Sequence, residues 1–155
     1  MSGHVSRGAP GTILALQAAL TAENAAIYGY GIAGAYLSGD SQATATNDWL
    51  AHQVARDRLE AIVRSLGAQP AAAAVAYQLP APVHSASEAV SLAVLLEDRI
   101  TTAYLGLVAL TDASIRDFGA QQVQASALRA AAWRGGTVAF PGMTAAALAA
   151  PRTQS

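Results

Sequence analysis

Apolar residues recur every three to four positions in four stretches of the chain, which is the spacing of amphipathic helices. In the first stretch this seam passes through Ile13, Leu16, Leu20, Glu23, Ile27, Tyr30, Gly34 and Leu37. We predict helices over residues 12–37, 43–66, 85–114 and 118–134, with Gly67 and Gly135 as stop signals. No stretch alternates in the manner of a β-strand, so the pattern predicts an all-α protein.

The connections predict how these helices are arranged. Short breaks, one of them the Ser-Gly-Asp-Ser cluster at residues 38–41, make the first and second helices antiparallel neighbours, and likewise the third and fourth. Residues 68–84 carry Pro70, Pro80 and Pro82, which exclude a continuous helix. We therefore expect two helical hairpins joined by one long crossover.

The length of 155 residues suits a single domain. We assign residues 12–142 to the helical bundle and expect a turn at residues 140–142 to pack against its end. Residues 1–11 are rich in glycine and serine and form a disordered arm, and residues 143–155 form a tail. The arm has no apolar run of the kind that signal peptides have, so we expect a cytoplasmic protein.

Glu23 interrupts the first apolar seam and is therefore predicted to be buried. An unpaired carboxylate in a bundle interior costs several kcal/mol. The sequence thus leaves three states open for this side chain: protonated, bound to a metal ion, or paired with cationic and hydrogen-bonding groups.

Loop positions indicate which residues face this acid. A first turn near Asp40 places Arg56 or Asp57 opposite Glu23. A second turn near residues 114–115 places Trp133 or Arg134 opposite Glu97. The second and third predicted helices also have apolar seams, which carry His52 and Glu97, and we expect these seams to face the bundle interior. The candidate buried polar cluster or ligand site consists of Glu23, His52, Arg56, Asp57, Glu97, Tyr28, Tyr30, Tyr104 and Arg134.

Several short motifs carry a resemblance to a known family. They are residues 16–31, His52 with Arg56-Asp57, the Glu97-Asp98 pair, and Trp133-Arg134 followed by Phe-Pro-Gly. Together they resemble an actinobacterial ferritin-like domain family of unassigned function. The resemblance covers about residues 14–142, implies a ferritin-like four-helix bundle with an acid on its first and third helices, and implies no known activity.

A ferritin-like di-iron site takes one Glu from each of two helices and a Glu-x-x-His pair from each of the other two. This chain has no Glu-x-x-His pair, and its fourth helix offers glutamine and serine instead of acids. We therefore expect no metal cofactor. The alternative is iron or manganese in an altered one- or two-metal site that uses Glu23, His52, Asp57, Glu60 and Glu97.

Three classes of function follow. The first is a metal-free pocket in which His52 is held by an acid and an arginine orients a polar or anionic small molecule. The second is a carboxylate and histidine metal site in an oxidoreductase. The third is a non-catalytic oligomer in which the cluster fixes the helix register. The chain contains no nucleophile–base pair and no cofactor fingerprint, so whether it is an enzyme stays open.

The hydrophobic content and the charge of the chain indicate which classes of partner it can bind. Hydrophobic residues make up 53% of the chain and charged residues only 12%, so we expect a homodimer that covers an apolar face. An apolar stripe on the third helix, from Leu92 to Leu110, is the expected contact. The net charge of −1 and the scattered arginines exclude nucleic acid as a partner, and Glu23 and Asn24 in the longest apolar stretch argue against a membrane.

Overall fold

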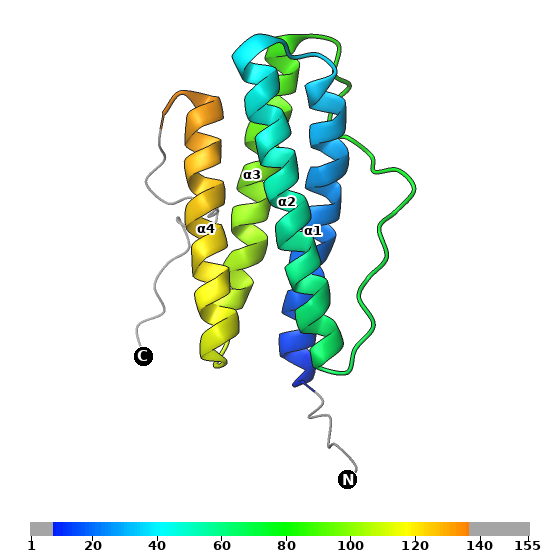
Figure 1. The fold of residues 1–155 in the computed structure, drawn as a ribbon, viewed down its shortest axis with the longest axis vertical. Coiled ribbons are helices and arrows are strands. Elements are labelled where there is room, and N and C mark those ends of the chain that lie inside the picture. Colours follow the sequence, from blue (N-terminus) through cyan, green and yellow to red (C-terminus); the bar gives the residue numbers. More distant parts are fainter. Residues whose placement is uncertain (1–7, 137–155) are drawn as a thin grey trace, which may run out of the picture.

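The computed structural model describes residues 8–136, and these residues form four helices and no strand (Figure 1). The helices are α1 (Pro10–Gly34), α2 (Gly39–Ser65), α3 (Ala86–Val108) and α4 (Ala113–Arg134). The all-α four-helix prediction is confirmed. Most of the predicted N-terminal arm, the turn at residues 140–142 and the tail at residues 143–155 lie outside the described residues.

The two helical hairpins lie side by side (Figure 1). In that view α1 runs upward, α2 and α3 run downward and α4 runs upward again, because the link after α2 returns along the whole bundle before α3 begins. The closest helix pairs are α1 with α2, α1 with α3, and α3 with α4. Helices α2 and α4 approach each other less closely.

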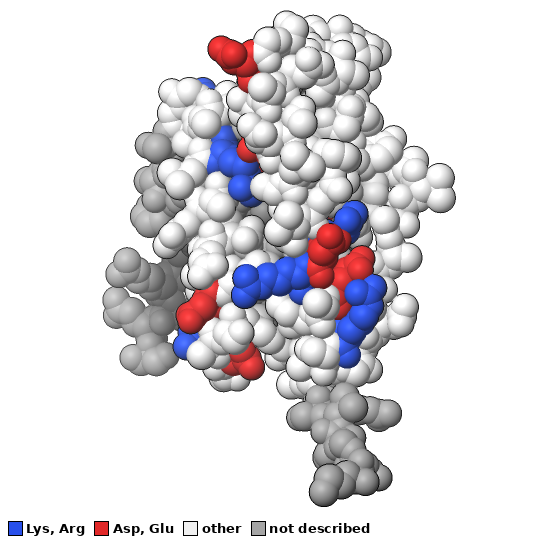
Figure 2. Space-filling model, viewed as in Figure 1, with Lys and Arg blue, Asp and Glu red and all other residues white. Residues whose placement is uncertain are grey.

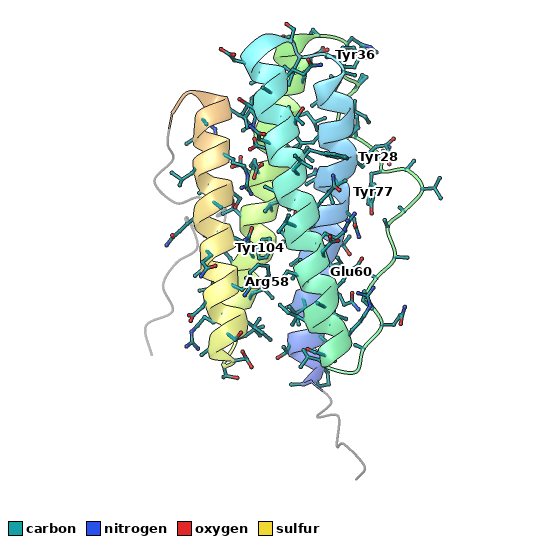
Figure 3. All side chains as sticks on the ribbon, in the orientation of Figure 1. Tyr28, Tyr36, Arg58, Glu60, Tyr77 and Tyr104 are labelled. Carbon is teal, nitrogen blue, oxygen red and sulfur yellow. The ribbon has the colours of Figure 1, made fainter. Side chains whose placement is uncertain are left out.

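The link between α2 and α3 is extended and lies against α1 (Figure 1). The Gln17 side chain holds it from both ends of its amide: Nε2 donates to the Gln69 carbonyl at 2.7 Å, and Oε1 accepts from the Ala71 N–H at 2.8 Å. Farther along, the rings of Tyr28 and Tyr77 are 5.6 Å apart and lie between α1 and the link (Figure 3). Side chains of α1 thus fix the long crossover to the bundle.

Local sequence signals explain where the helices begin and end. Ser85 caps α3 by accepting a hydrogen bond from the Glu88 N–H, and Asp112 caps α4 through the Ile115 N–H at 2.9 Å. Gly67 follows α2 with a φ of 75°, in the left-handed region that glycine tolerates, so it ends the helix as predicted.

The two short turns lie earlier in the sequence than predicted. Helix α2 begins at Gly39 with Ser38 at its N-cap, so most of the Ser-Gly-Asp-Ser cluster belongs to the first turn of the helix. Helix α4 begins at Ala113, before the predicted start at residue 118, because Asp112 supplies a cap that starts the helix there. Each turn is displaced toward the N-terminus, which changes the residues that face each other across both hairpins.

The stripe on α3 that we expected to contact a second copy is buried within the single chain. Leu92, Leu96, Ile100 and Leu107 are all at most 5% exposed. Helix α3 packs on both α1 and α4, so both of its apolar sides are used inside the bundle. The large apolar side chains that remain exposed include Leu50 on α2 and Leu128 on α4.

Most of the surface facing the viewer in Figure 2 is uncharged, and the basic side chains there lie beside acidic ones instead of forming one patch. A continuous basic face is what nucleic-acid binding requires. Within residues 8–136, no helix is long and apolar enough to cross a membrane.

Candidate functional site

Each of the four helices contributes one charged side chain to a single level of the bundle interior. We call this set the charge cluster: Glu23 from α1, His52 from α2, Glu97 from α3 and Arg129 from α4. The first three side chains are fully buried, and the Arg129 side chain is 18% exposed. The cluster therefore links all four helices through hydrogen-bonded charges.

His52 lies between the two acids and uses both ring nitrogens. Its Nδ1 is 2.7 Å from Glu23 Oε2, and its Nε2 is 2.9 Å from Glu97 Oε1. A neutral imidazole has only one N–H, whereas an imidazolium can donate to both carboxylates. The geometry therefore suits the protonated ring.

The hydrogen bonds that the Glu97 carboxylate accepts from described residues all end on one oxygen. Its Oε1 accepts from His52, from the Tyr30 hydroxyl at 2.7 Å and from Arg129 Nε at 3.0 Å. Among the described residues, its other carboxylate oxygen, Oε2, is buried and has no hydrogen-bond donor. The charge of Glu97 is thus balanced by two cationic side chains that approach from α2 and α4.

Two buried tyrosines complete the shell of the acids. Tyr104 donates to Glu23 Oε1 at 2.7 Å, while Tyr30 donates to Glu97 and stacks on the His52 ring with 5.3 Å between centroids. Each phenol thus solvates one carboxylate.

A further acid, Asp48, lies one helical turn before His52 on α2. Its Oδ2 accepts from Trp133 Nε1 at 2.8 Å and lies 3.3 Å from the Tyr30 hydroxyl. Tyr30 has a single proton, and the shorter distance to Glu97 assigns that proton to Glu97. Asp48 is therefore held mainly by the indole N–H of Trp133 and lies at the edge of the charge cluster.

Burial and neighbouring charges set the protonation of the cluster. Burial acts to lower the pKa of His52, but the hydrogen bonds to Glu23 and Glu97 outweigh it and raise the pKa to about 9. Burial acts to raise the pKa of Glu97, but the hydrogen bond and charge of His52, followed by the charge of Arg129, hold it below its usual value. At neutral pH the cluster thus contains an imidazolium and an ionised Glu97.

The two buried tyrosines keep their protons. Burial and then the charge of the adjacent glutamate raise the pKa of Tyr30 and of Tyr104, so both phenols remain hydrogen-bond donors. Burial also raises the pKa of Asp48, against the hydrogen bond from Trp133.

The structure brings together five of the residues that the sequence singled out. They are Glu23, His52, Glu97, Tyr30 and Tyr104. The interior position predicted for Glu23 and its pairing with hydrogen-bonding groups are both observed.

The other candidates lie elsewhere, and for the predicted arginine pairs this is a correction. Arg56 bonds its neighbour Asp57 at the surface, with Arg56 Nη2 2.8 Å from Asp57 Oδ1, and does not reach Glu23. Arg134 pairs with Asp98 instead of Glu97. Glu60 pairs with Arg64 on the outside of α2.

Tyr28 is also placed away from the charge cluster. It packs against Tyr77 of the link, which the labelled side chains in Figure 3 show. Its position on α1 is two residues before Tyr30, about half a helical turn around, so the two rings point to different sides of the helix.

Both hairpin turns lie before their predicted positions, and this explains why Arg56 and Arg134 were wrongly predicted as partners of the buried acids. The first turn lies at residues 35–38 instead of at Asp40, so the side chain opposite Glu23 is His52, one helical turn before Arg56. The second turn also comes earlier, so Arg129 replaces Arg134 as the partner of Glu97. The sequence signal that could have found Arg129 is the Asp112 cap, which shows where α4 begins.

The charge cluster does not fit a di-iron centre of the carboxylate-bridged kind, which needs acidic or imidazole ligands from all four helices. Helix α4 presents the cation Arg129, and its Ser126 hydroxyl is bonded at 2.7 Å to Thr101. His52 already occupies the space between the acids with both nitrogens. Within the described part of the chain, no three His, Cys, Asp or Glu side chains are grouped so that they could hold a metal ion.

The protonated state of His52 predicts how stability depends on pH. Its folded pKa of about 9 lies above the ordinary value of 6.5, so protonation contributes stability that is fully present below about pH 6.5 and lost as pH rises through 9. We expect the free energy of unfolding to fall by about 3 kcal/mol over this interval. Urea unfolding at pH 6, 7.5 and 9.5 measures the effect.

The exposed histidine His84 provides a matched control for this experiment. His84→Asn should leave the pH profile unchanged, whereas His52→Asn should remove the loss of stability above pH 6.5. A wild-type profile that is flat between pH 6 and 9.5 would contradict a buried imidazolium.

A second prediction compares two arginines. Arg129→Met removes a hydrogen bond to a buried carboxylate and should lower the free energy of unfolding by about 1.5–3 kcal/mol. Arg56→Met removes only a surface contact and should change it by less than about 0.5 kcal/mol. Combining Arg129→Met with Glu97→Gln should cost less than the sum of the single changes, because the two groups are coupled. Equal losses from the two single arginine variants would refute the assignment of Arg129 to the cluster.

Comparisons with known proteins agree with this architecture. A family described as "Domain of unknown function (DUF4439)" matches residues 15–145. The chain is similar to a crystal structure of a conserved hypothetical protein, rv2844, from Mycobacterium tuberculosis, with 32% sequence identity and a TM-score of 0.80 over 83% of this chain and 98% of that one. No curated protein matches the chain. The match over most of the described bundle shows that the chain belongs to the DUF4439 family.

Proposed function

We propose that this protein is a metal-free, ferritin-like bundle that acts as a binding module and not as a redox enzyme. In this proposal the charge cluster replaces the metal ions that cross-link the helices of other ferritin-like bundles. The single observation that carries it is the position of His52, with one ring nitrogen on Glu23 and the other on Glu97.

Charge balance supports the proposal. His52 and Arg129 offset the charges of Glu23 and Glu97, so a divalent cation placed among them would meet two positive groups. Metal ligation by His52 would also require the loss of a proton from a ring whose pKa is about 9.

Acid–base catalysis also has little support in the cluster. When protonated, His52 has no free lone pair, and both of its N–H groups are already donated to carboxylates. The buried hydroxyls of Thr101 and Ser126 bond each other and backbone carbonyls, so neither faces a base. The cluster is therefore better suited to fixing the register of four helices that carry a binding surface.

A single-metal site is the second candidate, and one observation favours it. Glu97 Oε2 is buried without a donor among the described residues, and a metal ion would satisfy it. Such a site would combine Glu23, His52 and Glu97 as ligands after the imidazole turns away from one acid.

Nitrogen NMR of the labelled full chain distinguishes the two candidates. The metal-free proposal predicts that both ring nitrogens of His52 carry protons at pH 7, with the resonances assigned by their loss in His52→Gln. It also predicts metal well below one equivalent in protein purified from cells supplemented with iron and manganese. One equivalent of tightly bound metal, lost in Glu97→Gln, would replace this proposal with the single-metal site.

We further propose that the protein forms a homodimer in the cytoplasm. The low charge content and the exposed side chain of Leu50 on α2 support association. Light scattering should show a dimer that Leu50→Glu weakens, because a charge would be buried in the contact. Leu14→Glu changes an equally apolar exposed position on α1 and serves as the control. A monomer at all concentrations would exclude the dimer.

A further inference from the structure

A groove separates α2 from α4 on the outside of the charge cluster. Its volume is about 310 Å³, within the range of small-molecule sites. The walls combine apolar and cationic side chains, among them Val54, Ala55, Phe118, Ala125, Arg58 and Arg129. None of the described residues that line it is acidic.

Arg129 presents unused donors to this groove. Its Nε is bound to Glu97, and in the described part of the chain this is the one acceptor that the guanidinium reaches. The two terminal nitrogens thus have no acceptor among residues 8–136, and the Arg129 side chain lines the groove. Because Glu97 already fixes the side chain, little conformational freedom is lost when an anion binds to it.

Arg58 supplies a second cation to the same groove. Its guanidinium carbon lies 4.4 Å from the centroid of the Phe118 ring, and among residues 8–136 it forms no ion pair. Figure 3 shows Arg58 in the region between α2 and α4, close to Tyr104 in this view. A cation held flat on an aromatic ring has its position fixed while its N–H edge stays free.

We propose that the α2/α4 groove binds a small organic carboxylate with a compact apolar body. The guanidinium of Arg129 suits a carboxylate because its paired N–H groups match the two oxygens, and Arg58 adds a second positive charge. Val54 and Phe118 offer apolar surface that the body of the ligand would cover, and the alanines leave the space that it occupies.

The groove is physically connected to both buried acids. Arg129 contacts Glu97 directly. The Phe118 ring meets Tyr104 edge-on with 5.6 Å between centroids, and the Tyr104 hydroxyl is bonded to Glu23. A carboxylate bound to Arg129 thus adds negative charge close to the cluster, which favours the protonated form of His52.

This inference goes beyond the proposed metal-free core and does not depend on it. The test is isothermal titration calorimetry of the full chain with benzoate, benzamide and inorganic phosphate. A chelator is present so that no metal ion contributes to binding. We expect benzoate to bind with a Kd below about 1 mM. Benzamide, which has the same shape without the charge, should bind at least about tenfold more weakly. Phosphate, which lacks the apolar body, should also bind more weakly than benzoate.

Variants locate the site. Arg58→Gln should weaken benzoate binding about tenfold without touching the cluster. Ala125→Leu should abolish binding by filling the groove from α4 while leaving both arginines in place. Arg99→Gln removes the same charge from an exposed position on α3 that forms no ion pair among the described residues, and it should leave the affinity unchanged.

Several results would overturn the proposal. Equal binding of benzoate and benzamide would show that the arginines do not recognise the ligand, and equal losses in Arg58→Gln and Arg99→Gln would show a nonspecific charge effect. Tighter binding of phosphate than of benzoate would exclude the apolar subsite. Absence of benzoate binding at millimolar concentration would exclude the proposed carboxylate site.

Discussion

The bundle depends on a buried imidazolium that bridges two carboxylates. Glu23 and Glu97 come from helices separated in the sequence by α2 and the long link, and neither could stay ionised in an apolar interior without a positive partner. His52 provides that partner for both at once, at 2.7 and 2.9 Å. Arg129 then brings the fourth helix to the same point.

This arrangement sets the spacing of the rest of the molecule. Helix α2 reaches both acids with the short imidazole of His52, whereas α4 reaches only Glu97, with the long side chain of Arg129. Helix α4 can therefore lie farther from α2 and still contact the cluster. The α2/α4 groove is the space between these two helices. It has a volume of about 310 Å³, and the Arg129 side chain forms part of its wall. The interior charge cluster and the outer groove therefore both follow from having His52 on α2 and Arg129 on α4.

A cluster in which an imidazolium bridges two carboxylates differs chemically from a metal centre. A metal centre requires deprotonated ligands and has open positions for chemistry, while an imidazolium uses its donors on the two acids and has none left. Such a cluster also contributes little net stability compared with an apolar core, because the charges must first be desolvated. In the observed register of the four helices, all of these partners meet at one level of the interior.

The sequence by itself determined the number of helices, the long crossover and the interior position of Glu23, because these follow from local spacing, proline and the cost of interrupting an apolar seam. It also identified His52, Glu97 and two of the tyrosines as members of the interior set. It could not determine which cation meets which acid. A turn displaced by a few residues moves the facing position by one helical turn, and this displacement replaced Arg56 with His52 and Arg134 with Arg129. Only the tertiary structure fixes that register, because it depends on where capping groups such as Asp112 start each helix and on how the helices then pack.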